Sequence, residues 1–190
     1  MAKRKKDRSG RYVSRGGDKL ERALTAFGID VTGMVSADLG ANVGGFTDCL
    51  LQHGAARVYA VETGYGVLDW KLRQDDRVVV MERTNVLHVD LNALVDVVVS
   101  DVGWTPLRRY VPRALQMLKP GGSCVALLKS QYEVDRSALV DGHVGDEHVE
   151  AIVASVVEEL KGLPCRVEDV LDPGLDVGGR NAERFVWIKP

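Results

Sequence analysis

The sequence lacks a long apolar run and contains few cysteines. No hydrophobic stretch approaches the ~18 residues that a membrane-spanning helix needs, and no apolar segment follows the basic N-terminus MAKRKKDRSGR, as a secretory signal peptide would require. The three cysteines are far apart and form no C-x-x-C pair. They predict small buried side chains in a reducing compartment, and not a disulfide framework or a zinc site. We therefore expect a cytoplasmic protein that does not enter a membrane.

Metal-binding patterns are also scarce. His143 and His148, in the stretch HVGDEH, come nearest to a pair of metal ligands, but no convincing third ligand accompanies them. Zinc sites in proteins generally use three or four protein ligands. We therefore expect no metal.

Charge is distributed unevenly along the 190 residues. Residues 1–24 carry nine Lys or Arg and three Asp or Glu, whereas the remainder carries 16 and 24. A basic arm on an acidic body suggests that a polyanion docks at one end, although a solvated, disordered tail has the same composition. We predict a flexible basic tail at residues 1–11 and one domain at residues 12–190.

Short β-branched or apolar runs alternate with amphipathic runs along most of the chain. This alternation predicts an α/β fold with a doubly wound parallel sheet. The last two strands, CRVEDVLD and RFVWIKP, have no helix between them, so we expect an antiparallel C-terminal hairpin. A Rossmann-like, seven-stranded sheet that ends in this way is typical of S-adenosylmethionine (SAM) methyltransferases. Helices are expected at residues 18–29, 44–54, 65–75, 106–122 and 146–163; Pro112 should divide or kink the fourth, and Pro120-Gly121-Gly122 should end it.

A glycine-rich turn joins the first strand to the next helix and suggests a ligand site. The turn, Gly40-Ala41-Asn42-Val43-Gly44-Gly45, lacks the second glycine of the dinucleotide pattern G-x-G-x-x-G. It also lacks the Lys-Ser/Thr pair that completes a phosphate-binding loop. The turn therefore suits a ligand without phosphate, such as SAM, whose amino-acid end can approach the backbone closely. A purely structural strand–helix turn is the alternative.

Polar residues follow the next two strands. Glu62 ends the second strand and suits a ribose diol, which both NAD and SAM possess. Glu82 and Asn85 follow the third strand, where a SAM site usually meets the adenine. These positions support a nucleoside site without identifying the nucleoside.

Charged residues occur at four places where they are unexpected. Asp101 and Lys129 each follow an apolar strand, and a buried lysine is costly unless it is paired, so Asp101 is its natural partner. Lys19 is expected in the first turn of a helix, where the helix dipole opposes it, and Glu183 begins the last strand. A structural ion pair at the sheet edge is the alternative to a catalytic role.

Several stretches together resemble the FtsJ-like ribose methyltransferases, and specifically their TlyA, or hemolysin A-like, branch. The resemblance spans residues 12–185. The stretches that carry it are YVSRGGDKL, DLGANVGGFTDCLLQHGA, VYAVETGYGVLDWKLRQDDRV, ERTN, SDVGWTPL, LLKSQYE and GGRNAERF.

The resemblance implies methyl transfer from SAM to a ribose 2′-hydroxyl of RNA, which in this branch is a cytidine of ribosomal RNA. It places a catalytic Lys-Asp-Lys-Glu tetrad on Lys19, Asp101, Lys129 and Glu183. Lys129 is expected to position and deprotonate the hydroxyl. A second lysine and burial would lower its pKa, whereas the two acids would raise it, so the net direction stays open. Together with the glycine turn, the resemblance gives these expected cofactor contacts: Asp38, Gly40, Gly44, Gly45, Phe46, Glu62, Glu82, Asn85 and Asp101.

The chain departs from the branch in three respects. Only the basic tail precedes YVSRGG, where the branch has a small RNA-binding domain, so a partner protein or a second copy could supply that role. The segments DVSFISL and KPQFE of the branch read DVGWTPL and KSQYE here. Trp104 and Tyr132 in these segments could stack on a base or could simply pack. The target RNA and nucleotide therefore stay open.

Other functions remain as alternatives. The chain could be a non-catalytic factor that binds SAM or RNA, or a SAM methyltransferase with a protein or small-molecule substrate. A membrane-lytic role, which the name hemolysin would suggest, has no support from the apolar pattern.

Overall fold

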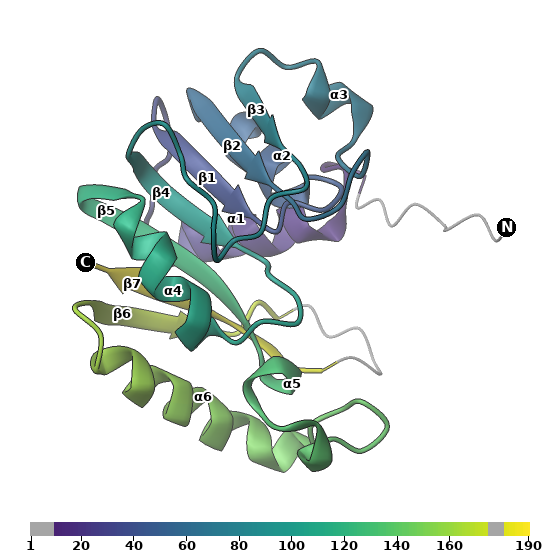
Figure 1. Cartoon of the computed structure of the whole chain (residues 1–190), viewed down its shortest axis with the longest axis vertical. Coiled ribbons are helices and arrows are strands. Elements are labelled where there is room, and N and C mark those ends of the chain that lie inside the picture. The colour runs from purple at the N-terminus through teal and green to yellow at the C-terminus, as the bar shows by residue number, and fades with distance from the viewer. Residues whose placement is uncertain (1–9, 175–180) are drawn as a thin grey trace, which may run out of the picture.

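The computed structural model describes residues 10–174 and 181–190, which form a seven-stranded sheet with helices on both faces (Figure 1). The predicted basic tail lies almost entirely outside the described residues. The strands are β1 (Val35–Leu39), β2 (Arg57–Val61), β3 (Val78–Met81), β4 (Val95–Ser100), β5 (Leu118–Lys129), β6 (Arg166–Leu171) and β7 (Glu183–Lys189). The helices are α1 (Arg15–Phe27), α2 (Gly45–Gln52), α3 (Trp70–Arg73), α4 (Leu107–Gln116), α5 (Ser130–Glu133), the 3₁₀ helix η1 (Arg136–Ala138) and α6 (Asp146–Lys161).

The strand order is β3-β2-β1-β4-β5-β7-β6. The first five strands in this order run parallel, and β7 inserts antiparallel between β5 and β6. This arrangement confirms the predicted doubly wound sheet with an antiparallel C-terminal hairpin. The direction of winding reverses between β1 and β4, and ligands of such sheets bind beyond the carboxyl ends of the strands at that point.

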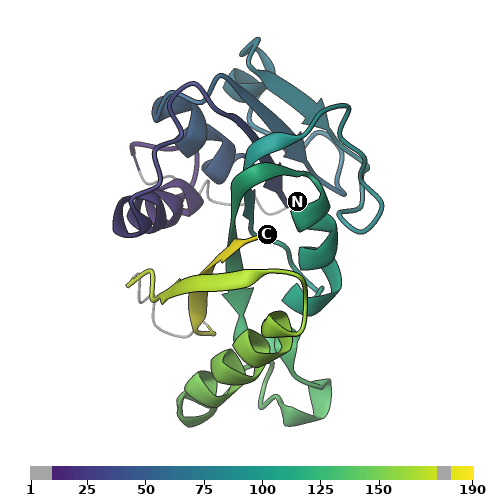
Figure 2. The same ribbon diagram turned by 90° about the vertical axis from the view of Figure 1, so that its left-hand side faces the viewer.

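Helices cover each face of the sheet and build two apolar cores (Figure 2). On one face, α4 and α6 pack through buried side chains such as Tyr110 and Leu160. On the other face, α1 and α2 pack through side chains such as Leu20 and Leu50. The strands between them are buried on both sides, which explains why they read as continuous apolar runs.

Helix α1 begins three residues earlier than its sequence pattern indicates. Ser14 caps it by accepting a hydrogen bond from the Gly16 N–H, and Gly28 ends it in a left-handed conformation. The expectation that Lys19 stands in the first turn was therefore wrong, since it lies in the second turn, where the opposition of the helix dipole is weaker. The early start carries the N-terminus of α1 to the carboxyl edge of the sheet.

The segment from residue 106 to residue 122 also differs from its prediction. Helix α4 is a single helix that includes Pro112 and ends at Gln116, so the expected division was wrong. Proline removes one backbone hydrogen bond, and the buried face of the helix holds the remaining turns in place. Pro120-Gly121-Gly122 does not end the helix but lies within β5, where the pairing with β4 shifts register.

Two further expectations can be compared with the described residues. Cys49 and Cys124 are free and buried, as predicted, and Cys165 is free and half-buried. Within the described residues, no helix is both long enough and apolar enough to cross a membrane.

Phe185→Ala should destabilise the fold strongly. The Phe185 ring is fully buried on β7 and lies 5.9 Å, centroid to centroid, from the ring of Phe46 on α2. Its loss should lower the free energy of unfolding by about 3–5 kcal/mol, because a cavity would remain between sheet and helix. Denaturant titration measures this change. Val140→Ala, at a side chain that is 76% exposed, is the matched control and should change it by less than about 0.5 kcal/mol. A loss below about 1 kcal/mol for Phe185→Ala would contradict the packing described.

Candidate active site

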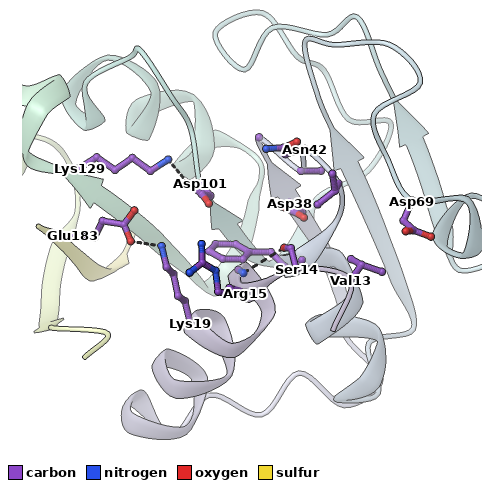
Figure 3. A pocket seen from close by; sticks show the side chains of 16 residues that line it. Val13, Ser14, Arg15, Lys19, Asp38, Asn42, Asp69, Asp101, Lys129 and Glu183 are labelled. Atoms are coloured by element: carbon purple, nitrogen blue, oxygen red, sulfur yellow. Dashed lines mark hydrogen bonds and ion pairs between the residues drawn. The ribbon is translucent and has the colours of Figure 1, made fainter. Parts of the chain in front are cut away.

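Two adjoining cavities lie at the carboxyl edge of the sheet, with volumes of about 500 and about 490 Å³. Gly40, Asn42, Asp101 and Lys129 line both cavities, so these residues mark the place where the two meet. The first cavity extends toward the start of α1, and the second extends toward the loops after β2 and β3. Figure 3 shows the first cavity, with charged side chains from several elements turned toward its centre.

The glycine turn gives close approach at three points. Gly40 has a φ of +85°, and a Cβ atom there would lie 2.7 Å from the carbonyl oxygen of Asp101. Gly44 has a φ of +100° and caps α2; it lies against leucine side chains and does not line either cavity. Gly45 packs against Ser14 and the first residues of α1, so it allows the N-termini of α1 and α2 to meet at the first cavity. The N-termini of the two helices, with their partial positive charge, therefore face the cavity together.

Asp38 is a completely buried carboxyl at the wall of the first cavity. Its Oδ2 accepts hydrogen bonds from the N–H and the hydroxyl of Thr47, at 2.9 and 2.7 Å. Its Oδ1 has no hydrogen-bond partner among the described residues. Burial raises the pKa of Asp38 to about 7, helped by the charges of Asp101 and Glu62 and opposed by the bonds from Thr47.

Glu62 connects the second cavity to the glycine turn. Its Oε2 accepts the Asn42 N–H at 2.8 Å, and its Oε1 accepts the Gly64 N–H at 2.8 Å. Oε1 also accepts the Thr63 hydroxyl at 3.1 Å. A carboxylate can accept about four hydrogen bonds, so Oε2 retains capacity for a ligand. Asn85 also lines this cavity, and its side-chain oxygen accepts the Leu87 N–H at 2.9 Å.

Glu82 is a predicted cofactor contact whose carboxylate is turned toward another part of the protein and away from both cavities. It pairs with Arg73 and accepts the Val67 N–H at 3.1 Å, and it lines neither cavity. The hydrogen bond from Arg73 lowers its pKa to about 2. Because Val67 lines the second cavity, the structure gives Glu82 a role in fixing that wall.

The four charged residues that were singled out from the sequence all line the first cavity. They form two ion pairs, Lys129 with Asp101 and Lys19 with Glu183 (Figure 3). The predicted partnership of Lys129 with Asp101 is therefore present. In the register of β5 with β7, Lys129 lies directly opposite Glu183, which brings the two pairs together.

The pKa of Lys129 reflects two opposing effects. Burial alone would lower it, but the charges of Asp101 and Glu183 and the hydrogen bond to Asp101 outweigh burial. The net pKa is raised above the ordinary value of lysine, so Lys129 is an ammonium group near pH 7. This resolves the direction that the sequence left open.

Two aromatic rings stand beside the second cavity. Trp104 is 81% exposed and has a φ of +64°, and its ring lies 5.3 Å, centroid to centroid, from that of Tyr132. The Lys129 Nζ lies 5.9 Å from the centre of the Tyr132 ring. The ring contact joins the segment DVGWTPL to the segment KSQYE. A hydrogen bond joins them again, because Glu133 accepts the N–H of Leu107 at the start of α4. The segments DVGWTPL and KSQYE therefore form one unit at the site.

Sequence reasoning missed several residues that line the first cavity. Ser14 and Arg15 reach it because α1 begins early, and Asp69 reaches it from the start of α3. The signal that could have identified them was the cap pattern of Ser14, which places the following residues at a helix N-terminus.

The residues present fit SAM. The buried Oδ1 of Asp38 offers an acceptor to an amino group, the N-termini of α1 and α2 offer their partial positive charge to a carboxylate, and Glu62 offers an acceptor to a ribose. Gly40 and Gly45 line the first cavity and, because they lack a side chain, let the segments of Asp101 and Ser14 close its wall. Among the described residues, no group of three or more His, Cys, Asp or Glu side chains could hold a metal ion.

The sheet order, the glycine turn at the switch point and the acid after β2 together define the SAM-dependent methyltransferase class of fold. The profile of the FtsJ-like methyltransferase family matches residues 12–173, and the chain belongs to that family. At 16% identity and a TM-score of 0.68, a SAM-dependent methyltransferase from Mesorhizobium loti shares the fold, with 90% of this chain and 98% of that chain covered.

The chain is also similar to three proteins at higher identity. It is 46% identical over 148 residues to a candidate rRNA methyltransferase, YqxC, of Bacillus subtilis, which covers 75% of this chain and 53% of the relative. It is 38% identical over 183 residues to the 16S/23S rRNA (cytidine-2′-O)-methyltransferase TlyA of Mycobacterium tuberculosis, with 94% and 68% covered. A candidate hemolysin from Lactococcus lactis superposes with a TM-score of 0.89 at 34% identity, with 95% and 89% covered. The chain thus spans from about half to about two thirds of the length of the two methyltransferase relatives.

Asp38→Asn should remove a pH dependence of stability. The raised pKa means that the folded protein binds a proton more tightly than the unfolded chain does, so wild-type stability should fall as pH rises from about 4 to about 7. Asparagine does not ionise and should flatten this part of the profile. Denaturant unfolding at several pH values measures the difference between the two proteins. Asp90→Asn, at a side chain that is 92% exposed, is the control and should keep the wild-type slope; parallel profiles for wild type and Asp38→Asn would contradict the buried environment.

Proposed function

We propose that this protein transfers the methyl group of SAM to a ribose 2′-hydroxyl of RNA, and that the RNA is ribosomal. The observation that carries the proposal is the convergence of two lysine–acid pairs, Lys129 with Asp101 and Lys19 with Glu183, on one cavity beside the glycine turn. The family membership and the activity printed for the TlyA relative support it.

The cofactor would lie across the two cavities. We assign its contacts to Asp38, Gly40, Gly45, Phe46, Glu62, Asn85 and Asp101, with Gly44 and Glu82 shaping the turn and the wall behind it. SAM supplies a sulfonium methyl whose bond to sulfur breaks as the bond to the ribose oxygen forms, which leaves S-adenosylhomocysteine. The remaining work, which is to orient the hydroxyl and remove its proton, belongs to the side chains of this chain.

Lys129 would orient the hydroxyl and receive its proton. As an ammonium it can donate a hydrogen bond to the ribose oxygen, but only the neutral amine can accept the proton. Its raised pKa makes that neutral form scarce near pH 7. Asp101 fixes the direction of the amine, and Glu183 holds Lys19 beside this pair (Figure 3).

Trp104 and Tyr132 would contact the base of the target nucleotide. Trp104 exposes most of its ring, and the pair adjoins the cavity wall formed by Lys129 and Asp101. Aromatic rings stack on any base, so this pair would hold the nucleotide without selecting it.

Lys129→Ala should abolish methyl transfer while SAM binding is retained. The test is transfer of labelled methyl from SAM to total RNA, followed by nucleoside analysis, with SAM affinity measured by calorimetry. The rate should fall by at least about 100-fold. The wild-type rate should rise with pH between about 6.5 and about 9. The reason is that, at any pH below the pKa of a lysine, each rise of one pH unit increases its neutral fraction about tenfold. Near-wild-type turnover by Lys129→Ala would show that another group takes the proton.

The nucleoside analysis also separates the other functions. A 2′-O-methylated nucleoside that appears only with active protein would establish the reaction and name the base. Bound SAM with no labelled product would favour a non-catalytic binding factor. Label in protein or in a small molecule would favour a different methyltransferase.

We further propose that residues 12–190 form the catalytic unit and that the basic tail contributes to RNA binding. The tail carries most of the excess positive charge of the first 24 residues. A second copy or a partner protein is the other source of RNA contacts that we propose.

Deletion of residues 1–11 should weaken RNA binding and leave SAM binding intact. Each phosphate contact that is lost should reduce the dependence of log K on log salt by about 0.7 for single-stranded RNA. RNA affinity measured at several salt concentrations tests this. Equal affinities and equal slopes with and without the tail would assign RNA binding to the rest of the chain.

A further inference from the structure

Most basic side chains of the described residues have an acidic partner. Five do not pair with a carboxylate, and no hydrogen bond ties their side chains to a carbonyl oxygen: Arg57, Arg83, Arg109, Arg136 and Lys189. Since the chain has more acidic than basic residues overall, cations without partners stand out. Their positions in the fold are informative.

Three of these arginines follow parallel strands at the edge that carries the cavities. Arg83 comes two residues after β3, Arg109 stands in the first turn of α4 after β4, and Arg136 begins η1 after β5 and α5. All three are exposed. Arg57 and Lys189 stand at the opposite edge, since β2 begins at Arg57 and the antiparallel β7 ends at Lys189.

Each of the three arginines shares its part of the edge with an exposed or half-exposed aromatic ring. The guanidinium of Arg83 lies 4.3 Å from the centre of the Tyr65 ring, which is 72% exposed. Arg109 follows Trp104 in the loop and first turn after β4, and Arg136 follows Tyr132 in the segment after β5. Arg83 thus contacts a ring directly, and Arg109 and Arg136 lie in the same segments as the other two rings. Exposed arginines together with aromatic rings are features that bind single-stranded nucleic acid.

Hydrogen bonds hold together the loops that carry these arginines and aromatic rings. The Arg83 N–H donates to the Gly64 carbonyl at 3.1 Å, and Thr84 donates to the Glu62 carbonyl at 2.9 Å, so the loops after β2 and β3 are tied together. Arg83 itself has a φ of +53°, an uncommon conformation for a side chain of its size. At the other end, Glu133 joins the segments that carry Trp104 and Tyr132.

We propose that Arg83, Arg109 and Arg136, with their aromatic neighbours, form a track that binds the phosphates of a single RNA strand on both sides of the target nucleotide. The proposal rests on the proposed function, and it adds a surface that lies outside the predicted tetrad and the cofactor contacts. Strands β3 and β5 are four places apart in the sheet, so at about 4.8 Å per strand they are on the order of 19 Å apart, and the track extends at least from one to the other. A track of this length accommodates a few nucleotides, with the cavities between its ends.

The charges that face the track do not neutralise it. Glu82 is bound by Arg73, Asp90 lies 3.5 Å from Arg113, and the buried Glu133 caps α4. Asp90 and Asp135, the latter next to Arg136, are exposed acids within these segments. None of the three guanidinium groups holds a carboxylate or carbonyl of the described residues in place, and the intramolecular side-chain contact made by one of them is that of Arg83 with the exposed Tyr65 ring.

The test compares the triple variant Arg83→Ala, Arg109→Ala, Arg136→Ala with the control Arg57→Ala, Lys189→Ala. Both remove unpaired positive charge, but from opposite edges of the sheet. The probe is a fluorescent oligocytidine RNA of about twelve nucleotides, titrated with the full chain at several salt concentrations. SAM affinity and the thermal midpoint of each variant are measured alongside. SAM affinity should match the wild type because all five side chains are outside the cofactor contacts. The thermal midpoint should match because none of the five forms an ion pair, or a hydrogen bond to a carbonyl oxygen, with the described residues.

We expect the triple variant to lose at least about tenfold in RNA affinity at low salt and to reduce the salt slope by about 2, which corresponds to three phosphate contacts. The control should keep the wild-type slope. The proposed track would be wrong if the triple variant kept the wild-type salt slope. It would also be wrong if the control lost as much RNA affinity per charge removed as the triple variant does. If the wild type binds RNA in this way but transfers no methyl to any RNA, the proposed reaction fails while the track stands; if methyl transfer to RNA occurs and the triple variant binds normally, the track alone fails.

Discussion

The site depends on keeping four largely buried charged side chains close together at the wall of one cavity. A lone buried charge is costly, and the cost is offset only when an opposite charge stands beside it. Two lysines and two acids meet this condition by pairing crosswise between α1, β4, β5 and β7. The sheet order places β4, β5 and β7 side by side, and the early start of α1 brings the fourth side chain to them. The arrangement holds Lys129 as a cation in the absence of other molecules.

Much of this could be predicted from the sequence because parallel strands end at a common edge. Asp101 and Lys129 were found as charged residues after apolar runs, and adjacent parallel strands then brought them together. The alternation of apolar and amphipathic runs was enough to predict the doubly wound parallel sheet and its antiparallel C-terminal hairpin. Helix boundaries were less accessible: the start of α1 is set by the cap at Ser14, and the apolar pattern begins later than that cap.

Other features of the site could not be predicted, because they depend on where a side chain points and on which distant segments meet. The spacing of residues in the sequence specifies neither. Glu82 follows β3 as an adenine contact would, but its carboxylate turns toward Arg73 because that pairing satisfies it within the protein. Pro120 reads as the end of a helix, yet the chain turns into β5 two residues earlier and absorbs the proline in a shift of register. Ser14 and Arg15 reach the cavity only because α1 and α2 meet at their N-termini, where Gly45 leaves room. Local sequence does not specify such long-range contacts.

The pairing of Lys129 with Glu183 in the β5–β7 register has a consequence for the order in which the molecule is completed. Glu183 is the first residue of the last strand, and a slip of one position would turn its side chain to the other face of the sheet. Before β7 pairs with β5, the cavity lacks one of its carboxylates. The four charges therefore come together only once β7 has joined the sheet in the correct register.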